Sequence, residues 1–303
     1  MKIKSKLAIM AVASLSLAGT AHADVIASSN LNITNLFFTD GTNALLGNEF
    51  STISGSNTGE TNATLNGVDA PLNSGIATGP LFGTFDLDQA CIGGGCPPFG
   101  ENNFSDSTGL PATTNYALGD QLSSGIGFAG SGVSASTRAD VVLDGNGSGS
   151  STTDTGFNAT VILDVQTTTD FGVSFDWDVF ALTEIDISSG GSAAGFARNN
   201  WSLSVFEVAQ AGVVNNFASA FFQVGALNAP TGLTDSSGEV KHDLQGSADS
   251  GALLTMVAGH KYSVTISHQS LADATNVPEP TSLALLGLGL IGMGASKKRL
   301  LRK

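Results

Sequence analysis

Two aspartates lie two positions apart in a segment whose residues alternate between apolar and polar. Asp176 and Asp178 alternate with Phe175, Trp177 and Val179. Residues two apart on a strand share a face, with Cα atoms about 7 Å apart. That spacing suits a glycosidase carboxylate pair, and a tryptophan suits a sugar platform. Because Trp177 points to the opposite, apolar face, we favour a solvated acidic face.

The two cysteines of the chain, Cys91 and Cys96, flank the sequence Ile-Gly-Gly-Gly. A metal site would need two more ligands, and no other Cys or His lies nearby. The flexible loop can bend enough to close a bridge, provided that the chain is exported to an oxidising compartment. We therefore predict a disulfide that shapes a local turn.

The sequence Asp144-Gly-Asn146-Gly-Ser148-Gly149 matches the first half of a calcium loop, with an oxygen-bearing side chain at every other position. The twelfth position, where such a loop has an acid, is Thr155. An ordinary turn explains the same residues. Asp144, Asn146 and Ser148 therefore remain a minor metal-site hypothesis, beside weak binding of divalent cations over the acidic surface. No other cofactor is expected.

Three histidines follow the predicted leader: His242, His260 and His268. The sequence lacks a G-x-S-x-G nucleophile elbow, and a triad is defined by geometry rather than by residue inventory. We interpret these histidines as residues of surface turns and expect a protein that is not an enzyme.

Charge is distributed unevenly along the 303 residues. Residues 24–281 contain all 26 acids and only four basic residues, which gives a net charge of −22. A nucleic-acid-binding protein has a basic surface, so the composition excludes that class. The remaining basic residues lie near the two ends.

The acidic segment reads as β-structure. Alternating apolar residues predict strands separated by Gly-, Ser- and Asn-rich turns, and no amphipathic helix is evident. The clearest such sets are Val161, Leu163 and Val165; Phe171 to Val179; Trp201, Leu203 and Val205; and Tyr262, Val264 and Ile266. We predict an all-β, antiparallel, jelly-roll-like sandwich with long loops.

Two details of this prediction are more specific. The stretch from Leu253 through His260 to the strand at Tyr262 indicates a hairpin. Residues 145–156, rich in Gly and Ser, form the one plausible internal boundary. The residues before this boundary could be loops, further strands of the sandwich or a separate module.

The N-terminus has the three parts of a signal peptide. Three lysines precede an apolar run, which ends at Ala21-His-Ala23. The run would span only about 20 Å as a helix, too short for a membrane anchor. We predict that residues 1–23 are removed after Ala23 and that residues 24–276 form the exported body.

Residues 277–303 resemble a known sorting signal. Val277, Pro278, Glu279 and Pro280 precede an uncharged, Gly- and Leu-rich span at 281–296 and a basic cluster at 297–303. As a helix the span would nearly cross a bilayer, with the cluster kept on the cytoplasmic side. The cluster contains Lys297, Lys298, Arg299, Arg302 and Lys303. This arrangement resembles the PEP-CTERM sorting tail of Gram-negative bacteria.

The resemblance implies export and processing near the box by an exosortase, a membrane transpeptidase. It also implies transient anchoring in the inner membrane, then delivery to the cell surface or the exopolysaccharide matrix of a biofilm. We therefore expect a non-enzymatic matrix protein whose partners are the secretion machinery, the exosortase and anionic exopolysaccharide. The alternative is a secreted carbohydrate-active enzyme or carbohydrate-binding module on the same sandwich.

Overall fold

The computed structural model describes residues 23–72, 76–80, 83–96, 98–105, 114–125, 128, 132–145, 149–187, 191–210, 212–214 and 216–278. The predicted membrane span and basic cluster lie outside these ranges, as does the predicted signal peptide apart from Ala23. In the described ranges, no helix has the length and apolar character needed to cross a membrane.

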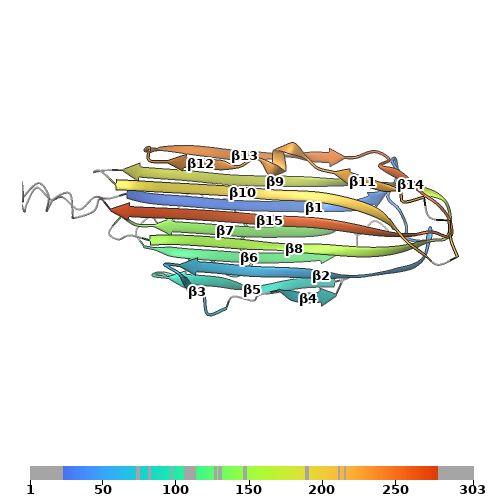
Figure 1. Ribbon diagram of the computed structural model, residues 1–303, viewed down its shortest axis with the longest axis horizontal. Coiled ribbons are helices and arrows are strands. Elements are labelled where there is room, and N and C mark those ends of the chain that lie inside the picture. The colour runs from blue at the N-terminus through green and yellow to red at the C-terminus, as the bar shows by residue number, and fades with distance from the viewer. Residues whose placement is uncertain are drawn as a thin grey trace, which may run out of the picture.

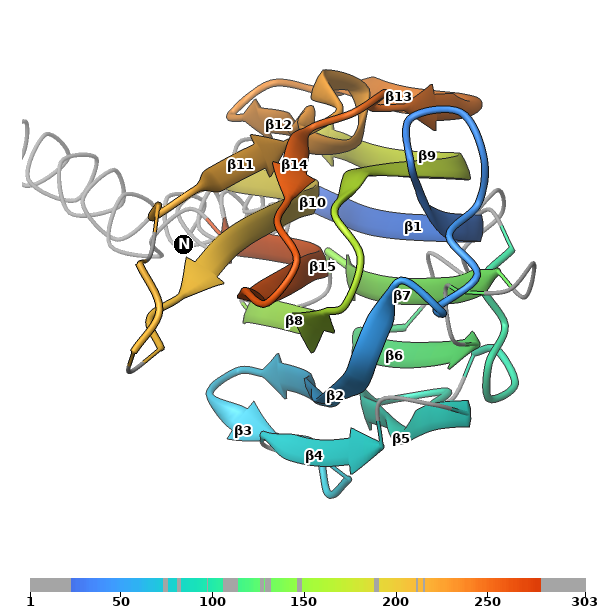
Figure 2. The same cartoon turned by 90° about the vertical axis from the view of Figure 1, so that its right-hand side faces the viewer.

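The chain forms two antiparallel sheets packed face to face, seen as two layers in Figure 2. Sheet A contains seven strands, in the order β13-β9-β1-β7-β6-β5, with β14 paired to β9. Their bounds are β1 Ala23–Thr39, β5 Gly83–Gly93, β6 Tyr116–Gly125, β7 Val133–Leu143, β9 Thr169–Ile187, β13 Gly238–Asp249 and β14 Leu254–Met256. The all-β antiparallel prediction is confirmed.

Sheet B contains eight strands, in the order β11-β10-β15-β8-β2-β3, with β12 paired to β10 and β4 to β2. Their bounds are β2 Phe50–Leu65, β3 Val68–Asp69, β4 Ala77–Pro80, β8 Gly149–Val165, β10 Gly191–Val208, β11 Ser219–Phe222, β12 Thr231–Thr234 and β15 Lys261–Pro278. A single 3₁₀ turn, η1 (Gly225–Asn228), is the only helical element in the described ranges.

The predicted alternation gives the inner faces of the sheets. Phe171, Val173, Phe175 and Val179 on β9 are buried, and Trp177 is half-buried against the same core. The apolar residues predicted for β8, β10 and β15 are buried as well. Period-two patterning therefore identified the core strands, because a strand with one solvated face must alternate.

The core changes character along the long axis of the sandwich, which is horizontal in Figure 1. One half contains bulky side chains such as Leu36, Phe38 and Trp201, whereas the other is dominated by alanines such as Ala27 and Ala197. In the alanine-rich half, a Cβ on Gly195 of β10 would lie 2.7 Å from Thr183 Cγ2 of β9. The two sheets are therefore so close there that any side chain at this position would force Thr183 to shift.

Strands from both sides of the proposed boundary at 145–156 interleave. β1 lies between β7 and β9, and β2 pairs with β8. Residues 149–156 are the first part of β8, paired with both β2 and β15. Residues 24–143 therefore supply further strands of the one sandwich.

The predicted hairpin before β15 is wrong. His260 N donates to Val257 O at 3.1 Å, so a tight turn does form there. The strands on either side then diverge, since β14 pairs with β9 in sheet A and β15 pairs with β8 and β10 in sheet B. The sequence correctly predicts the turn itself. A turn does not show whether the strands on either side pair with each other or belong to different sheets.

Candidate functional site

An open polar depression of about 400 Å³ lies on the outer face of sheet A. It is lined from β1, β9 and β13 by Asn32, Thr34, Asp176, Trp177, Asp178, Gln245, Gly246 and Ser247. Asp176 and Asp178 thus share one face, as predicted. The amide and hydroxyl groups that the neighbouring strands add could not be assigned to this site without the strand order.

Asp176 is held as an ionised acceptor. Asn35 Nδ2 donates to it at 2.8 Å and Ser247 Oγ at 2.6 Å, and these bonds lower the pKa of its carboxyl group. A glycosidase general acid needs the opposite shift, a raised pKa. Asp176 is therefore suited to accepting hydrogen bonds or attracting a cation rather than to donating a proton.

A second polar centre lies beside the depression, beneath residues 98–105. Arg138 on β7 is fully buried, and its Nε donates to Asp140 Oδ2 at 2.5 Å. Its Nη1 donates to the carbonyls of Asn103 and Ser105, and its guanidinium lies 3.9 Å from the centre of the Phe99 ring. The hydrogen bonds from Arg138 hold residues 98–105, the covering segment, on sheet A.

The predicted disulfide is confirmed: Cys91 and Cys96 are bonded, with their Cα atoms 5.7 Å apart. Both cysteines pack with Phe99 against a small apolar cluster on the outer face of sheet A. This cluster includes Tyr116, Leu118 and Phe180, and the covering segment shields it from water through Phe99. The Cys91–Cys96 disulfide therefore anchors one end of the segment that buries Arg138.

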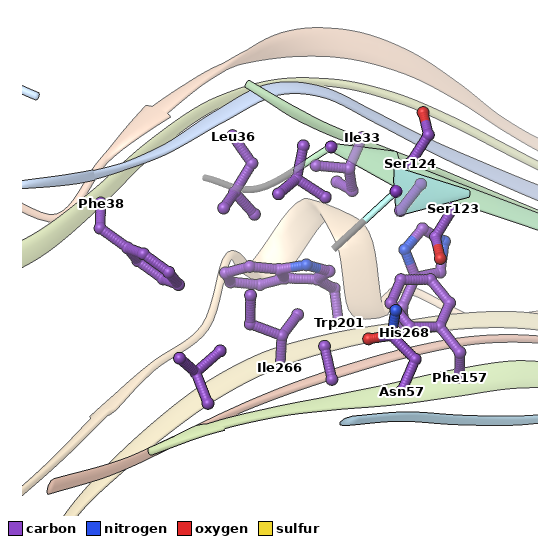
Figure 3. A pocket seen from close by; sticks show the side chains of 16 residues that line it. Ile33, Leu36, Phe38, Asn57, Ser123, Ser124, Phe157, Trp201, Ile266 and His268 are labelled. Atoms are coloured by element: carbon purple, nitrogen blue, oxygen red, sulfur yellow. The ribbon is translucent and has the colours of Figure 1, made fainter. Parts of the chain in front are cut away.

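A small cavity of about 40 Å³ lies between the sheets, next to Trp201 and His268 (Figure 3). His268 Nε2 lies 3.0 Å from the Leu31 carbonyl oxygen, so it donates and Nδ1 carries no proton in the neutral ring. Neither His268 Nδ1 nor Trp201 Nε1 has a partner. A water molecule needs about 10–15 Å³, so the cavity suits water and is too small for a sugar.

The surface-turn interpretation of the histidines is wrong for His268 and His242, which both lie on strands. His268 lies in mid-β15 at 1% exposure, and burial lowers the pKa of its imidazole to about 3. His242 is half-buried on β13, where its Nε2 contacts the Ala226 carbonyl oxygen at 2.9 Å. His260 does lie in a turn, as predicted.

His260 and Glu207 form a polar cluster, the Glu207 anchor, at the end of the sandwich opposite the alanine-rich end. The Nδ1 of His260 lies 2.7 Å from Oε1 of Glu207, whose side chain is fully buried. The same carboxylate accepts hydrogen bonds from the backbone N of Asn216 and Ala218. Burial favours a raised pKa, but these hydrogen bonds outweigh it and lower the pKa of Glu207. The anchor holds Phe217 at a φ of 51° and 73% exposure.

Two of the three ligands predicted for the calcium loop, Asn146 and Ser148, lie outside the described residues, which include Asp144. The backbone N of Asp144 donates to Asn115 Oδ1 at 2.5 Å. Across the ranges that the structure describes, no three His, Cys, Asp or Glu side chains are already arranged around a metal position. That loop remains a prediction.

The two ends of the body meet at the alanine-rich end of the sandwich. Ala23, the predicted last residue of the leader, is 1% exposed and pairs with Ile187 at the end of β9. The Asn276 side chain donates to the Ala23 carbonyl. Val277 and Pro278 form the last residues of β15, opposite Ser192 and Gly191. Ala21, Glu279, Pro280 and the basic cluster lie outside the described residues.

Comparison with known proteins adds one match, at this same end of the chain. No curated protein and no solved structure matches the sequence. A family model, the PEP-CTERM protein-sorting motif, matches residues 276–299. The match begins at Asn276, the residue that bonds Ala23, and continues through the box. The chain therefore carries a PEP-CTERM protein-sorting motif at its C-terminus and is an exported protein sorted through an exosortase.

Proposed function

We propose that this protein is a non-enzymatic component of the cell surface or exopolysaccharide matrix of a Gram-negative bacterium. Its jelly-roll-like body would be released from a transient inner-membrane anchor at 281–296 after removal of residues 1–23. The observation that carries the proposal is the sorting motif, whose first residues, Asn276 to Pro278, are the last residues of β15. An exosortase acting at the box would therefore separate a folded sandwich from the membrane.

The chemistry of the body supports a binding role. The net charge of −22 repels anionic polymers directly, so divalent cations would have to bridge its carboxylates to anionic polysaccharide. The depression at Asp176 and Asp178 offers ionised carboxylate and neutral amide groups on an open face. Such a face suits a long polymer better than an enclosed substrate.

The sorting part of the proposal is tested in the producing organism. A chain with Pro278, Glu279 and Pro280 all changed to alanine should stay in the membrane fraction, whereas the native protein should reach the matrix or medium. Thr275→Ala, an exposed change just before the motif, is the matched control and should be released normally. Equal release of the box variant would contradict sorting through the motif.

The matrix part is tested by cosedimentation. The released protein is mixed with the organism's own extracellular polysaccharide, with calcium or with EDTA. We expect binding in calcium that is lost in EDTA. Absence of binding under both conditions would contradict the matrix role while leaving export untouched.

The Asp176 and Asp178 depression also keeps a second candidate open, a carbohydrate-active enzyme or carbohydrate-binding module. Glycan cleavage that is lost in Asp178→Asn would favour the enzyme over the proposed function. Calcium-independent binding of a neutral glycan, lost in the same variant without any cleavage, would favour the binding module.

A further inference from the structure

One buried carboxylate oxygen on sheet A has no hydrogen-bond partner. Asp120 on β6 is fully buried. Its Oδ2 accepts hydrogen bonds from the backbone N of Asn102 at 2.8 Å and from Gln89 Nε2 at 3.3 Å. Its Oδ1 has none. A buried carboxylate oxygen without a partner is costly, so this position calls for a proton or a cation.

Further oxygens lie around the Asp120 carboxylate. Asn102 Oδ1 is also buried without a partner, while its Nδ2 donates to Asp86 Oδ2 at 3.1 Å. Glu101 Oε1 accepts a hydrogen bond from Gln89 N at 2.9 Å. Carboxylate and amide oxygens from β5, β6 and the covering segment therefore converge on one region.

Negative charges outnumber positive charges in this region. Burial, together with the charges of Glu101 and Asp86, raises the pKa of Asp120 to about 7. Burial and the charges of Asp86 and Asp88 raise the pKa of Glu101 as well. Arg138, opposite Asp120 on the neighbouring strand, forms its ion pair with Asp140. The cluster thus gathers negative charge around an unsatisfied oxygen.

We propose that Asp120, Asn102, Glu101 and Asp86 bind one Ca²⁺ ion. The fold fixes two donors, Asp120 Oδ1 and Asn102 Oδ1. The carboxylates of Asp86 and Glu101 are exposed and can turn onto the ion. In the described ranges no three carboxylates are already grouped as metal ligands, so the ion would have to draw the exposed carboxylates into place. Oxygen-only donors with flexible geometry favour Ca²⁺ over Zn²⁺ or Mg²⁺.

The position of the site gives the ion a structural effect. Glu101 and Asn102 belong to the segment that the Cys91–Cys96 bridge anchors at one end. An ion shared with Asp86 and Asp120 would fasten that segment to β5 and β6. Calcium at extracellular concentrations would then stabilise residues 98–105 over Arg138. This stabilisation would begin only after export.

The test is calcium titration of the purified full chain in mild detergent at pH 8, after EDTA treatment and dialysis. Isothermal calorimetry should show one Ca²⁺ per chain with a Kd of about 10⁻⁴–10⁻³ M, the range of extracellular calcium modules. Asp120→Asn should weaken binding at least tenfold. Because Asp120 is buried, Glu101→Gln on the exposed rim is the companion variant and should also weaken binding without loss of the fold.

Two controls locate the ion. Asp186→Asn, an exposed carboxylate on β9 of the same sheet but outside the depression, should leave the titration unchanged. Amide hydrogen exchange of residues 98–105 should slow in calcium in the native chain and not in Glu101→Gln. The proposal is overturned if the native chain shows no stoichiometric binding, or if Asp144→Asn abolishes it while Glu101→Gln does not.

Discussion

The side chain of Asn276 donates a hydrogen bond to the backbone carbonyl of Ala23, 253 positions earlier in the chain. Asn276 is 2% exposed and is the first residue matched by the sorting motif, while Ala23 is the predicted end of the leader. Both processing signals therefore lie at one end of the sandwich. A body held by either signal would have its opposite end, with the Glu207 anchor, pointing away from the membrane.

This contact gives the first prediction. Asn276→Ala leaves the Ala23 carbonyl unsatisfied and should destabilise the full chain by about 1–2 kcal/mol in urea denaturation. The same substitution should have a much smaller effect in a chain that begins at Asp24, because the acceptor is then absent. Thr275→Ala is the exposed control. Equal losses in the two chain lengths would show that the contact does not contribute.

The burial of Ala23 makes a second prediction about the order of events. β1 is an interior strand, and Ala23 pairs with Ile187. A peptidase needs an extended, unpaired substrate, so cleavage after Ala23 must precede pairing of β1 with β9. Purified, folded full chain should therefore resist signal peptidase, and the urea-unfolded chain should be cut after dilution. Rapid cleavage of the folded chain would contradict this order.

The inner-face strands could be predicted from sequence because burial on one face forces alternation, as at Phe171 to Val179. The disulfide followed from spacing and compartment. The pairing of β1 between β7 and β9, and the separation of β14 from β15, could not be predicted, because they depend on contacts between distant segments. The burial of Arg138 could not be predicted either, because composition alone does not distinguish it from Arg198, an equally rare basic residue that is exposed.

A third prediction concerns the acid sensitivity that His268 confers. Its pKa is about 3 in the folded protein against about 6.5 when unfolded, so the unfolded chain binds an extra proton between these values. Stability should therefore fall as pH decreases from about 6.5, by up to about 1.4 kcal/mol per pH unit. His268→Gln, which keeps a donor for Leu31, should flatten this part of the curve. Thermal denaturation from pH 7 to pH 4 measures it, and parallel curves for the two proteins would contradict it.

A fourth prediction concerns Glu207. Its pKa is lowered in the folded protein, so the ionised carboxylate adds to the free energy of unfolding. This contribution is fully present above the ordinary pKa of 4.5 and is lost as pH falls through the lower folded pKa. Acid should therefore release the loop around Phe217. Glu207→Gln should show faster amide exchange at Asn216 and Ala218 already at pH 7. Unchanged exchange would mean that the carboxylate does not hold the loop.

A fifth prediction concerns the Cys91–Cys96 bridge. The closed loop is short, so removing it in Cys91→Ser/Cys96→Ser should cost only about 2 kcal/mol of global stability. The local effect should be larger, with faster amide exchange across residues 98–105. Urea denaturation and exchange mass spectrometry on one sample separate the two effects. Exchange that is unchanged in this segment would contradict an anchoring role.

Export with processing at both ends is tested most directly by mass spectrometry of the native protein's two termini, after purification from the matrix or medium of the producing organism. Our account predicts an N-terminal peptide beginning at Asp24 and a C-terminal peptide ending near Pro278–Pro280, with the apolar span and basic cluster absent. Recovery of the intact 303-residue chain from the cytosol as the only form would contradict it.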